Sequence, residues 1–301
     1  QSLLYEKIQR LNDRTEKDRF YKYSDRTIKY CMKKLKKDPK NINYQFFLGT
    51  SYGYKSLIKI KFQSYMSSLR LAIKARKILE EIRAVDPNFA DNNYALGLLY
   101  FYTSVMANRS GGIVSLFSKM FILKSSDRTD EGLNLIIYAT ENDAVAKPYA
   151  DFSLMWAYLV IEKFDQAEKL SAQLIKKYPN DEIGRWVNAR ALYEKNDCKA
   201  AAEAFKTIET NLARKGHDVE KKFDDVTIAK NLAESCLAEQ NRDYSTARAI
   251  NKRVTKWLLD EESIPVASIE YQSESLLFTY WHNKIKAAEA RMAKEATKPV
   301  L

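Results

Sequence analysis

The stretch PYADFSLMWAYLVIEKFDQAEKLSAQLIKKYPND, residues 148–181, is followed directly by EIGRWVNARALYEKNDCKAAAEAFKTIETNL, residues 182–212. A shift of 34 positions gives the two stretches the same spacing of apolar and small residues. The shift pairs Met155 with Ala189, Tyr158 with Leu192, Ala167 with Ala201 and Leu174 with Ile208. Apolar residues three and four positions apart are typical of helices, and a period near 34 is typical of stacked helix pairs. The two stretches therefore predict two consecutive helix pairs.

Three prolines carry the same pattern towards the N-terminus. Pro39, Pro87 and Pro179 each stand ten residues before a small residue, namely Gly49, Gly97 and Ala189, and thirteen before Tyr52, Tyr100 and Leu192. Proline ends helices because it has no N–H, and glycine lets two backbones approach closely. We expect each proline to separate one helix pair from the next, and Gly97 to lie where two helices press together.

These residues resemble the pattern of the tetratricopeptide-repeat (TPR) family: an aromatic or aliphatic pair with a small residue in the first helix, an Ala and an aromatic in the second, and then a Pro. The resemblance is good over 140–212 and fair over 39–107. It implies an all-α fold, a right-handed superhelical solenoid of antiparallel helix pairs. The long first units, FFLGTSYGYKS and YALGLLYFY, are similar to uncharacterised bacterial repeat proteins of the cell envelope and to the periplasmic T component of some solute transporters.

Composition and spacing predict a single α-solenoid domain over 1–301. Only 8 Gly and 6 Pro interrupt the 301 residues, which favours long helices over a β fold with many turns. We expect basic helix pairs over 1–86, a repeat with an insertion over 87–141, the best-matched pair over 142–213, and a degenerate repeat with a C-terminal capping helix over 218–301. Further helices are predicted over 3–37, 130–141, 222–240, 243–259 and 264–296.

The insertion contains the loop Asn108-Arg109-Ser110-Gly111-Gly112 and then IVSLFSKMFIL, residues 113–123, which is apolar on most of its circumference. An apolar run that spans a bilayer as a helix needs about 18 residues, and the chain has none. Three roles remain for an inserted helix at 113–123: it plugs the inside of the superhelix, contacts a partner, or lies against a membrane surface. The plug is favoured because buried apolar helices are common.

The net charge of +11 is concentrated at the N-terminal end. Residues 1–86 carry 21 Lys and Arg against 9 Asp and Glu, whereas residues 87–301 carry 29 against 30. A basic end attracts anionic membranes, acidic proteins or nucleic acids. Sequence-specific nucleic-acid recognition is disfavoured because Lys dominates this stretch. A solvated helix face is the alternative interpretation. The basic patch comprises Lys33, Lys34, Lys36, Lys37, Lys55, Lys59 and Lys61.

The chain offers little for catalysis, and the sequence predicts no enzyme, no cofactor and no metal site. The two histidines, His217 and His282, lie 65 residues apart, without a zinc-binding motif. The acidic doublets Glu80-Glu81, Asp224-Asp225 and Glu261-Glu262 are interpreted as solvated faces, because adjacent residues on a helix diverge. We expect the three cysteines to be separate small hydrophobes rather than ligands, with Cys198 the most accessible of them.

The sequence therefore predicts a non-enzymatic scaffold that binds a protein or peptide in a concave groove. Asn and Arg in such grooves hold a peptide backbone or carboxylate. The alternative for each groove residue is an exposed position of an amphipathic helix. The candidate residues are Tyr54, Lys55, Tyr102, Asn108, Arg185, Asn188 and Arg190.

Two other functions are also compatible with the sequence. A small-ligand or lipid carrier would enclose an apolar cavity between Tyr52, Tyr100, Phe101, Met106 and the segment 113–123. A peripheral anchor would use the basic end on anionic membranes. The chain opens at Gln1 rather than Met, so we expect a preceding segment to have been removed. If that segment was a signal peptide, the protein works in the periplasm or cell envelope, and otherwise in the cytoplasm.

Overall fold

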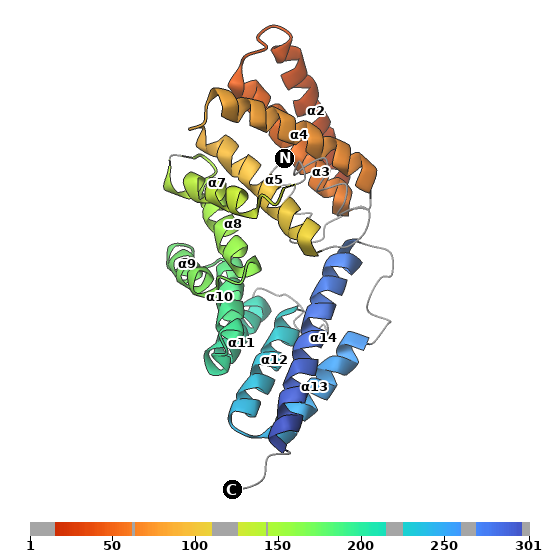
Figure 1. Cartoon of the computed structure of the whole chain (residues 1–301), viewed down its shortest axis with the longest axis vertical. Helices are drawn as coiled ribbons and strands as arrows, with labels where there is room; N and C mark the ends of the chain where they lie inside the picture. Colours follow the sequence, from red (N-terminus) through yellow and green to blue (C-terminus); the bar gives the residue numbers. More distant parts are fainter. Residues whose placement is uncertain are drawn as a thin grey trace. The chain divides into compact units, whose positions relative to one another are not determined.

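The computed structural model describes residues 16–61, 64–109, 126–142, 144–214, 225–259 and 269–296. All regular elements in these ranges are α-helices and none is a strand, which confirms the predicted all-α class for this part of the chain. The chain divides into two compact units, Gln1–Leu154 and Met155–Leu301. Figure 1 shows the helices. Unit 1 contains α2 (Glu16–Leu35), α3 (Ile42–Lys61), α4 (Tyr65–Val85), α5 (Ala90–Arg109) and α7 (Thr129–Glu141).

Helix α8 (Lys147–Val160) spans the boundary between the units. Unit 2 continues with α9 (Phe164–Lys177), α10 (Glu182–Glu194), α11 (Cys198–Arg214), α12 (Asp225–Gln240), α13 (Tyr244–Leu259) and α14 (Ile269–Ala296). The predicted helix ends at Pro39, Pro87 and Pro179 are observed, since α2, α4 and α9 all stop within four residues before a proline. The predicted helix over 3–37 is described only from Glu16, and the apolar segment 113–123 lies outside the described residues.

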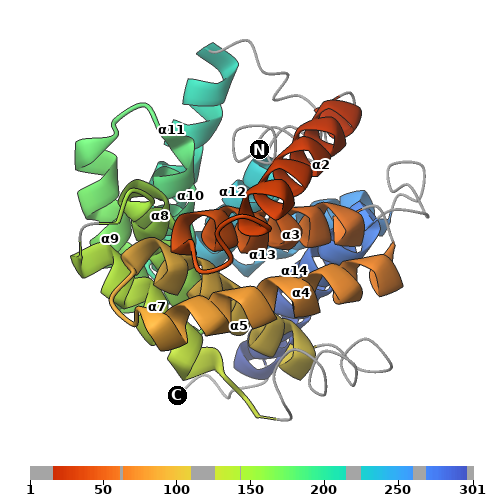
Figure 2. The same cartoon turned by 90° about the horizontal axis from the view of Figure 1, so that it is seen from above.

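In unit 1 each helix packs against the next described helix, and α3 also contacts α5. Figures 1 and 2 both show α3 and α4 running side by side. Helices α4, α5 and α7 share a buried core. Its members are Leu79, Ile82, Leu96, Tyr100 and Leu135. Phe20 of α2 and Ile58 of α3 form a smaller core. Apolar burial of this kind stabilises the packing by about 25 cal/mol per Å².

Helices α5 and α7 approach so closely that their backbones touch at two glycines. A Cβ atom added to Gly97 would lie 2.8 Å from the carbonyl oxygen of Gly132. One added to Gly132 would lie 2.5 Å from the backbone nitrogen of Phe101. Real Cβ atoms do not come this close to backbone atoms, so only glycine fits at either position. The predicted close contact at Gly97 is confirmed.

Unit 2 buries several of the positions that the shift of 34 residues pairs in the sequence. Ala189 of α10 and Ala201, Phe205 and Ile208 of α11 belong to one core that extends through α12 and α13. The C-terminal helix α14 joins this core through Trp281 and Ile285, which are 1% and 2% exposed. Helix α14 contacts α12 and α13. It therefore contributes to the interior of the unit.

Three helix pairs close with the same turn. Glu162, Asn196 and Arg242 have positive φ angles of 61°, 65° and 61°. Each follows the first helix of a pair, and the next N–H bonds back to a carbonyl five residues earlier, as in Lys163 to Tyr158 at 2.9 Å. The same bond joins Asp197 to Leu192 at 3.0 Å and Asp243 to Ala238 at 2.9 Å. Such a left-handed residue satisfies the last carbonyls of a helix. The third pair, α12–α13, thus repeats the local geometry of the first two.

A second recurring feature is a hydrogen bond to the carbonyl oxygen of each of the three prolines. The side chain six residues after each proline donates a hydrogen bond to that proline's carbonyl oxygen. Gln45 bonds to Pro39, Asn93 to Pro87 and Arg185 to Pro179, each at 2.8 Å. This bond ties the first turn of a helix to the segment that enters it, and it satisfies a carbonyl that the helix itself cannot reach.

Candidate functional site

A polar network in unit 1 is centred on Glu80 of α4. The Tyr100 hydroxyl donates to Glu80 at 2.5 Å, and the guanidinium groups of Arg76 and Arg128 donate at 3.1 and 3.2 Å. Arg128 also stacks over the Tyr100 ring, 3.6 Å from its centroid. Burial and the bond to Glu80 raise the pKa of Tyr100. The Glu80 carboxylate and the Arg128 guanidinium are each bonded to more than one partner, which holds both groups in place.

Two adjoining hollows open beside this network. The larger, of about 480 Å³, is lined by Arg83, Pro87, Asn93, Glu131, Asn134, Leu135 and Tyr138. The smaller, of about 320 Å³, is lined by Glu80, Arg83, Ala84, Leu96, Tyr100 and Arg128. Arg83 lines both and is held by Glu131 at 2.8 Å. We call the two hollows together the α4–α7 groove.

The α4–α7 groove combines an apolar floor with polar walls. Leu96 and Leu135 are buried at its base, whereas Asn134 is exposed on α7. Arg128 bonds to Glu131 at 2.7 Å and to Glu80, so both carboxylates are shared between arginines. Guanidinium and amide groups over an apolar floor are suited to bind a peptide backbone and one or two of its side chains.

The prediction that Glu80 belongs to a solvated face is wrong. Its carboxylate accepts bonds from three side chains, because Tyr100 and Arg128 approach it from α5 and from the start of α7. The neighbouring Glu81 is exposed, as predicted. Asp224, Glu261, Glu262 and the side chain of Asp225 lie outside the described residues.

Among the groove residues predicted from the sequence, four lie in unit 1 and each has an intramolecular contact. Tyr54 packs against the Phe20–Ile58 core. Lys55 forms an ion pair with Asp25. Burial raises the pKa of Tyr102 to about 12. Asn108 donates to Asp127 at 2.6 Å. None of the four lines the α4–α7 groove.

The other three predicted groove residues lie on α10. Arg185 donates to the Pro179 carbonyl, and Asn188 donates to Ser171 of α9 at 3.1 Å. Arg190 is 9% exposed, which contradicts its expected place on an open surface. Its guanidinium lies 3.9 Å from the Tyr280 ring and 4.6 Å from the Trp281 ring. Helix α14, which starts nearly 80 residues further along the chain, therefore covers Arg190.

Glu194 connects α14 to α10 through its charge. The carboxylate accepts from Arg190 at 2.8 Å, from Lys284 at 2.6 Å and from the Tyr280 hydroxyl. Burial alone would raise the pKa of Glu194, but the bonds from Lys284 and Tyr280 and the charge of Arg190 lower it. The buried carboxylate is thus held ionised, and its ion pairs fix the C-terminal helix in place.

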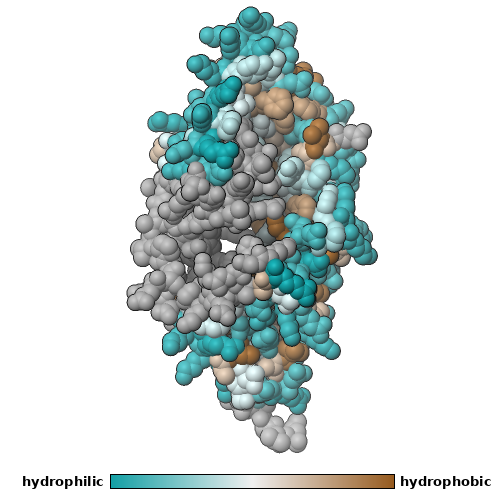
Figure 3. Space-filling model, turned by 180° about the vertical axis from the view of Figure 1, so that it is seen from behind, coloured by the Kyte–Doolittle hydropathy of each residue, from teal (hydrophilic) through white to brown (hydrophobic). Residues whose placement is uncertain are grey.

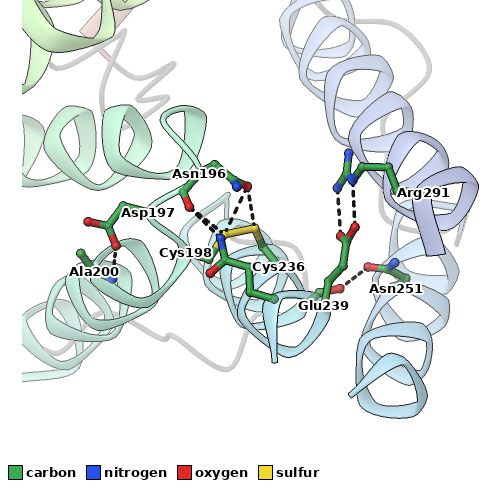
Figure 4. Close-up of a disulfide and its surroundings, with 10 residues drawn as sticks. Asn196, Asp197, Cys198, Ala200, Cys236, Glu239, Asn251 and Arg291 are labelled. Carbon is green, nitrogen blue, oxygen red and sulfur yellow. Dashed lines mark hydrogen bonds and ion pairs between the residues drawn. A yellow bond between two sulfur atoms is a disulfide. The ribbon is translucent and has the colours of Figure 1, made fainter. Parts of the chain in front are cut away.

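A disulfide joins Cys198, at the start of α11, to Cys236 of α12, with a Cα–Cα distance of 5.6 Å. Figure 4 shows the bond beside Asn196, whose backbone carbonyl accepts from Gln240 at 2.8 Å. The expectation that these cysteines are separate, and that Cys198 is the most accessible, is wrong: Cys198 is fully buried. Sequence spacing gave no indication of this, because the helices bring together cysteines that are 38 residues apart. Cys31 is free and buried, as expected.

The lysines of the predicted basic patch include exposed side chains and side chains that lie over tyrosine rings. Lys33, Lys36 and Lys37 are exposed, and Lys34 lies over the Tyr30 ring. Lys55 and Lys59 lie over the Tyr21 ring at 5.7 and 5.4 Å. The side chain of Lys61 lies outside the described residues. At the end of unit 1 formed by the α2–α3 turn, Figure 3 shows a hydrophilic surface.

Within the described ranges, no group of three or more His, Cys, Asp and Glu side chains is placed to hold a metal ion. In the same ranges no helix is long and apolar enough to cross a membrane. His282 is half-buried on α14, and His217 falls outside the described residues. Of the residues expected around a carrier cavity, Tyr100 and Phe101 are fully buried in unit 1, and the side chain of Met106 is not among those described.

No model of a known protein family matches the chain, and no curated protein matches it by sequence.

Proposed function

We propose that the protein is a non-enzymatic scaffold of the tetratricopeptide type that binds an extended peptide segment of a protein partner in the α4–α7 groove. The observation that carries the proposal is the pair of adjoining hollows that share Arg83. Their charged side chains are already bonded in place, so little conformational freedom is lost when a ligand binds. The lining carries two guanidinium groups, of Arg83 and Arg128, and two carboxylates, of Glu80 and Glu131, so its formal charge is balanced.

The solenoid arrangement is part of the same proposal. The support for it is the contact of alternate helices, α3 with α5, α10 with α12 and α12 with α14, together with the recurring turns. Stacked helix pairs make contacts of this kind between the first helices of neighbouring pairs.

We further propose that the protein works in an oxidising compartment such as the periplasm or cell envelope. The support is the Cys198–Cys236 disulfide, because disulfides persist in oxidising compartments and are rare where thiols are kept reduced. Mass spectrometry of the protein isolated from its source without reductant tests this. A free thiol at both cysteines would contradict it.

The binding proposal is tested by panning a random peptide library on the full chain and measuring the selected peptides by fluorescence anisotropy. Asn134→Trp fills the groove from an exposed position on α7, and Asn283→Trp makes the same change at an exposed position on α14. We expect the selected peptides to lose binding to N134W and to bind N283W as they bind the wild type.

Equal binding to both variants would place the peptide elsewhere, and a library without enriched sequences would remove the peptide proposal. Arg190→Glu is unsuitable as a test of binding. It would place a second carboxylate beside Glu194 in a buried site, and so it tests folding.

A further inference from the structure

The outer face of α2 carries a continuous stripe of positive charge. Its members follow one another at intervals of four, three, four and three residues, which places them on one side of a helix. The backbone N–H of the last member still bonds to Met32 at 3.2 Å, so the helical path reaches it. All five side chains are exposed. The stripe comprises Lys22, Arg26, Lys29, Lys33 and Lys36.

The orientation of the stripe is fixed by the packing of α2. Phe20, Ser24 and Cys31 point the opposite way and are buried, with exposed fractions of 0%, 0% and 2%. In the described part of unit 1, the ion pairs of α2 are Arg19 with Glu16 and Asp25 with Lys55. The stripe residues take part in neither pair. Five positive charges thus face solvent without a carboxylate partner among the described residues.

Aromatic side chains border the stripe on one flank. Tyr23 and Tyr30 are 45% and 53% exposed, although both are large. Tyr30 packs edge-on against Tyr44 of α3, with ring centroids 6.1 Å apart. Phe47, one turn further along α3, is 52% exposed. Aromatic rings next to Lys and Arg are typical of helices that lie at the boundary between water and a bilayer.

We propose that α2 docks on the surface of a membrane that contains anionic phospholipids. The stripe contacts the headgroup phosphates, and Tyr23 and Tyr30 enter the headgroup layer. From Lys22 to Lys36 the stripe is about 21 Å long at 1.5 Å per residue. A row of this length fits an extended charged plane, whereas a small anion would contact only one or two of its members. The single Arg among five members argues against nucleic acid, whose binding sites favour Arg for stacking and bidentate bonds.

The acidic side chains near the stripe are few and leave its charge in place. Asp25 is paired with Lys55. Two exposed carboxylates remain near the stripe: Asp18, four residues before Lys22, and Asp38, which accepts a hydrogen bond from Asn41 at 3.0 Å. Each Lys or Arg near an anionic membrane strengthens binding by about 1 kcal/mol, or about fivefold in affinity. The proposed attachment depends on exposed charges, so it is sensitive to salt. The proposal does not depend on the α4–α7 groove.

Co-sedimentation with vesicles tests the proposal. The full chain is mixed with vesicles of phosphatidylcholine and phosphatidylglycerol, and separately with vesicles of phosphatidylcholine alone. The test variant is Lys22→Glu/Lys29→Glu/Lys33→Glu. The control is Lys169→Glu/Lys199→Glu/Lys206→Glu, which makes the same change in net charge at exposed positions of unit 2.

We expect the wild type and the control to bind the anionic vesicles at low salt and to be released at high salt. The stripe variant should bind at least about 100-fold more weakly. Tyr23→Ser/Tyr30→Ser should weaken binding while the salt dependence stays the same. Equal loss in stripe and control variants, or no binding at low salt, would overturn the proposal. So would tighter binding to polyglutamate or duplex DNA than to anionic vesicles at the same salt.

Discussion

Gly97 and Gly132 lie where the backbones of α5 and α7 touch, and neither has room for a Cβ atom. We expect Gly132→Ala to destabilise the protein by about 1–3 kcal/mol, because the added methyl group meets the backbone of Phe101 and the helices must separate. Urea unfolding followed by circular dichroism measures the change. Gly53→Ala is the matched control: its Cβ would lie 3.9 Å from Ala75, so a gain of about 0.5–1 kcal/mol from helix propensity is expected.

Glu194→Gln should be the most damaging single change of charge in unit 2. It leaves Arg190 and Lys284 without their carboxylate, and removal of one partner of a buried ion pair costs about 3–5 kcal/mol. Thermal unfolding measures the loss. The same substitution at Glu81, in an exposed pair with Lys77, should change stability by less than about 0.5 kcal/mol. Similar effects at both sites would show that the Glu194 pairs contribute little.

The same carboxylate predicts a dependence on pH. The pKa of Glu194 is lowered in the folded protein, so its ion pairs contribute fully above the ordinary Glu value of 4.5. The contribution is lost as the pH falls through the folded pKa. The difference in unfolding free energy between wild type and Glu194→Gln should therefore shrink as the pH falls from 4.5 through the lowered pKa of the folded protein. A difference that stays constant over this range would contradict the assignment.

The disulfide should stabilise unit 2 measurably. It closes a loop with a sequence separation of 38 residues, for which the chain-entropy account gives about 2–4 kcal/mol. We expect reduction to lower the unfolding temperature of the wild type and to leave Cys198→Ser/Cys236→Ser unchanged. If the reductant acts equally on both proteins, the effect does not arise from this bond.

The recurring proline bond predicts that position 185 tolerates an amide. Arg185→Gln should keep wild-type stability, because Gln45 makes the equivalent bond to Pro39. Arg185→Ala should lose about 1 kcal/mol, since the Pro179 carbonyl loses its donor. Chemical unfolding of the two variants distinguishes a role in the turn from a role in partner binding. A loss of equal size in R185Q would show that the arginine charge matters instead.

The helix ends were predicted well from the sequence because they depend on local signals. The prolines end α2, α4 and α9, and Gly97 lies at the close contact that its spacing implies. The hydrogen bond from Arg185 to the Pro179 carbonyl also had a local signal. Gln45 and Asn93 likewise stand six residues after a proline and make the equivalent bond. This interval indicates that Arg185 bonds to the turn, whereas its place in a groove stays a prediction.

The residues that the sequence misplaced depend on distant segments. Arg190 sits at an outward position of α10 by its spacing, and only the later helix α14 covers it. The partners of Glu80 come from α5 and from Arg128 before α7, so its role in the network depends on how those elements pack. Helical periodicity gives the face of one helix but does not identify the element that packs against it.

The Cys198–Cys236 bond also changes how unit 2 responds to force. A pull on the two ends of the chain passes through the covalent link and bypasses the segment between the cysteines, which are 38 positions apart. About 130 Å of extended chain is thereby withheld from stretching, at roughly 3.4 Å per residue. In an oxidising environment helix α11 and the part of α12 up to Cys236 cannot be pulled out by tension, whereas reduction would release that length at once.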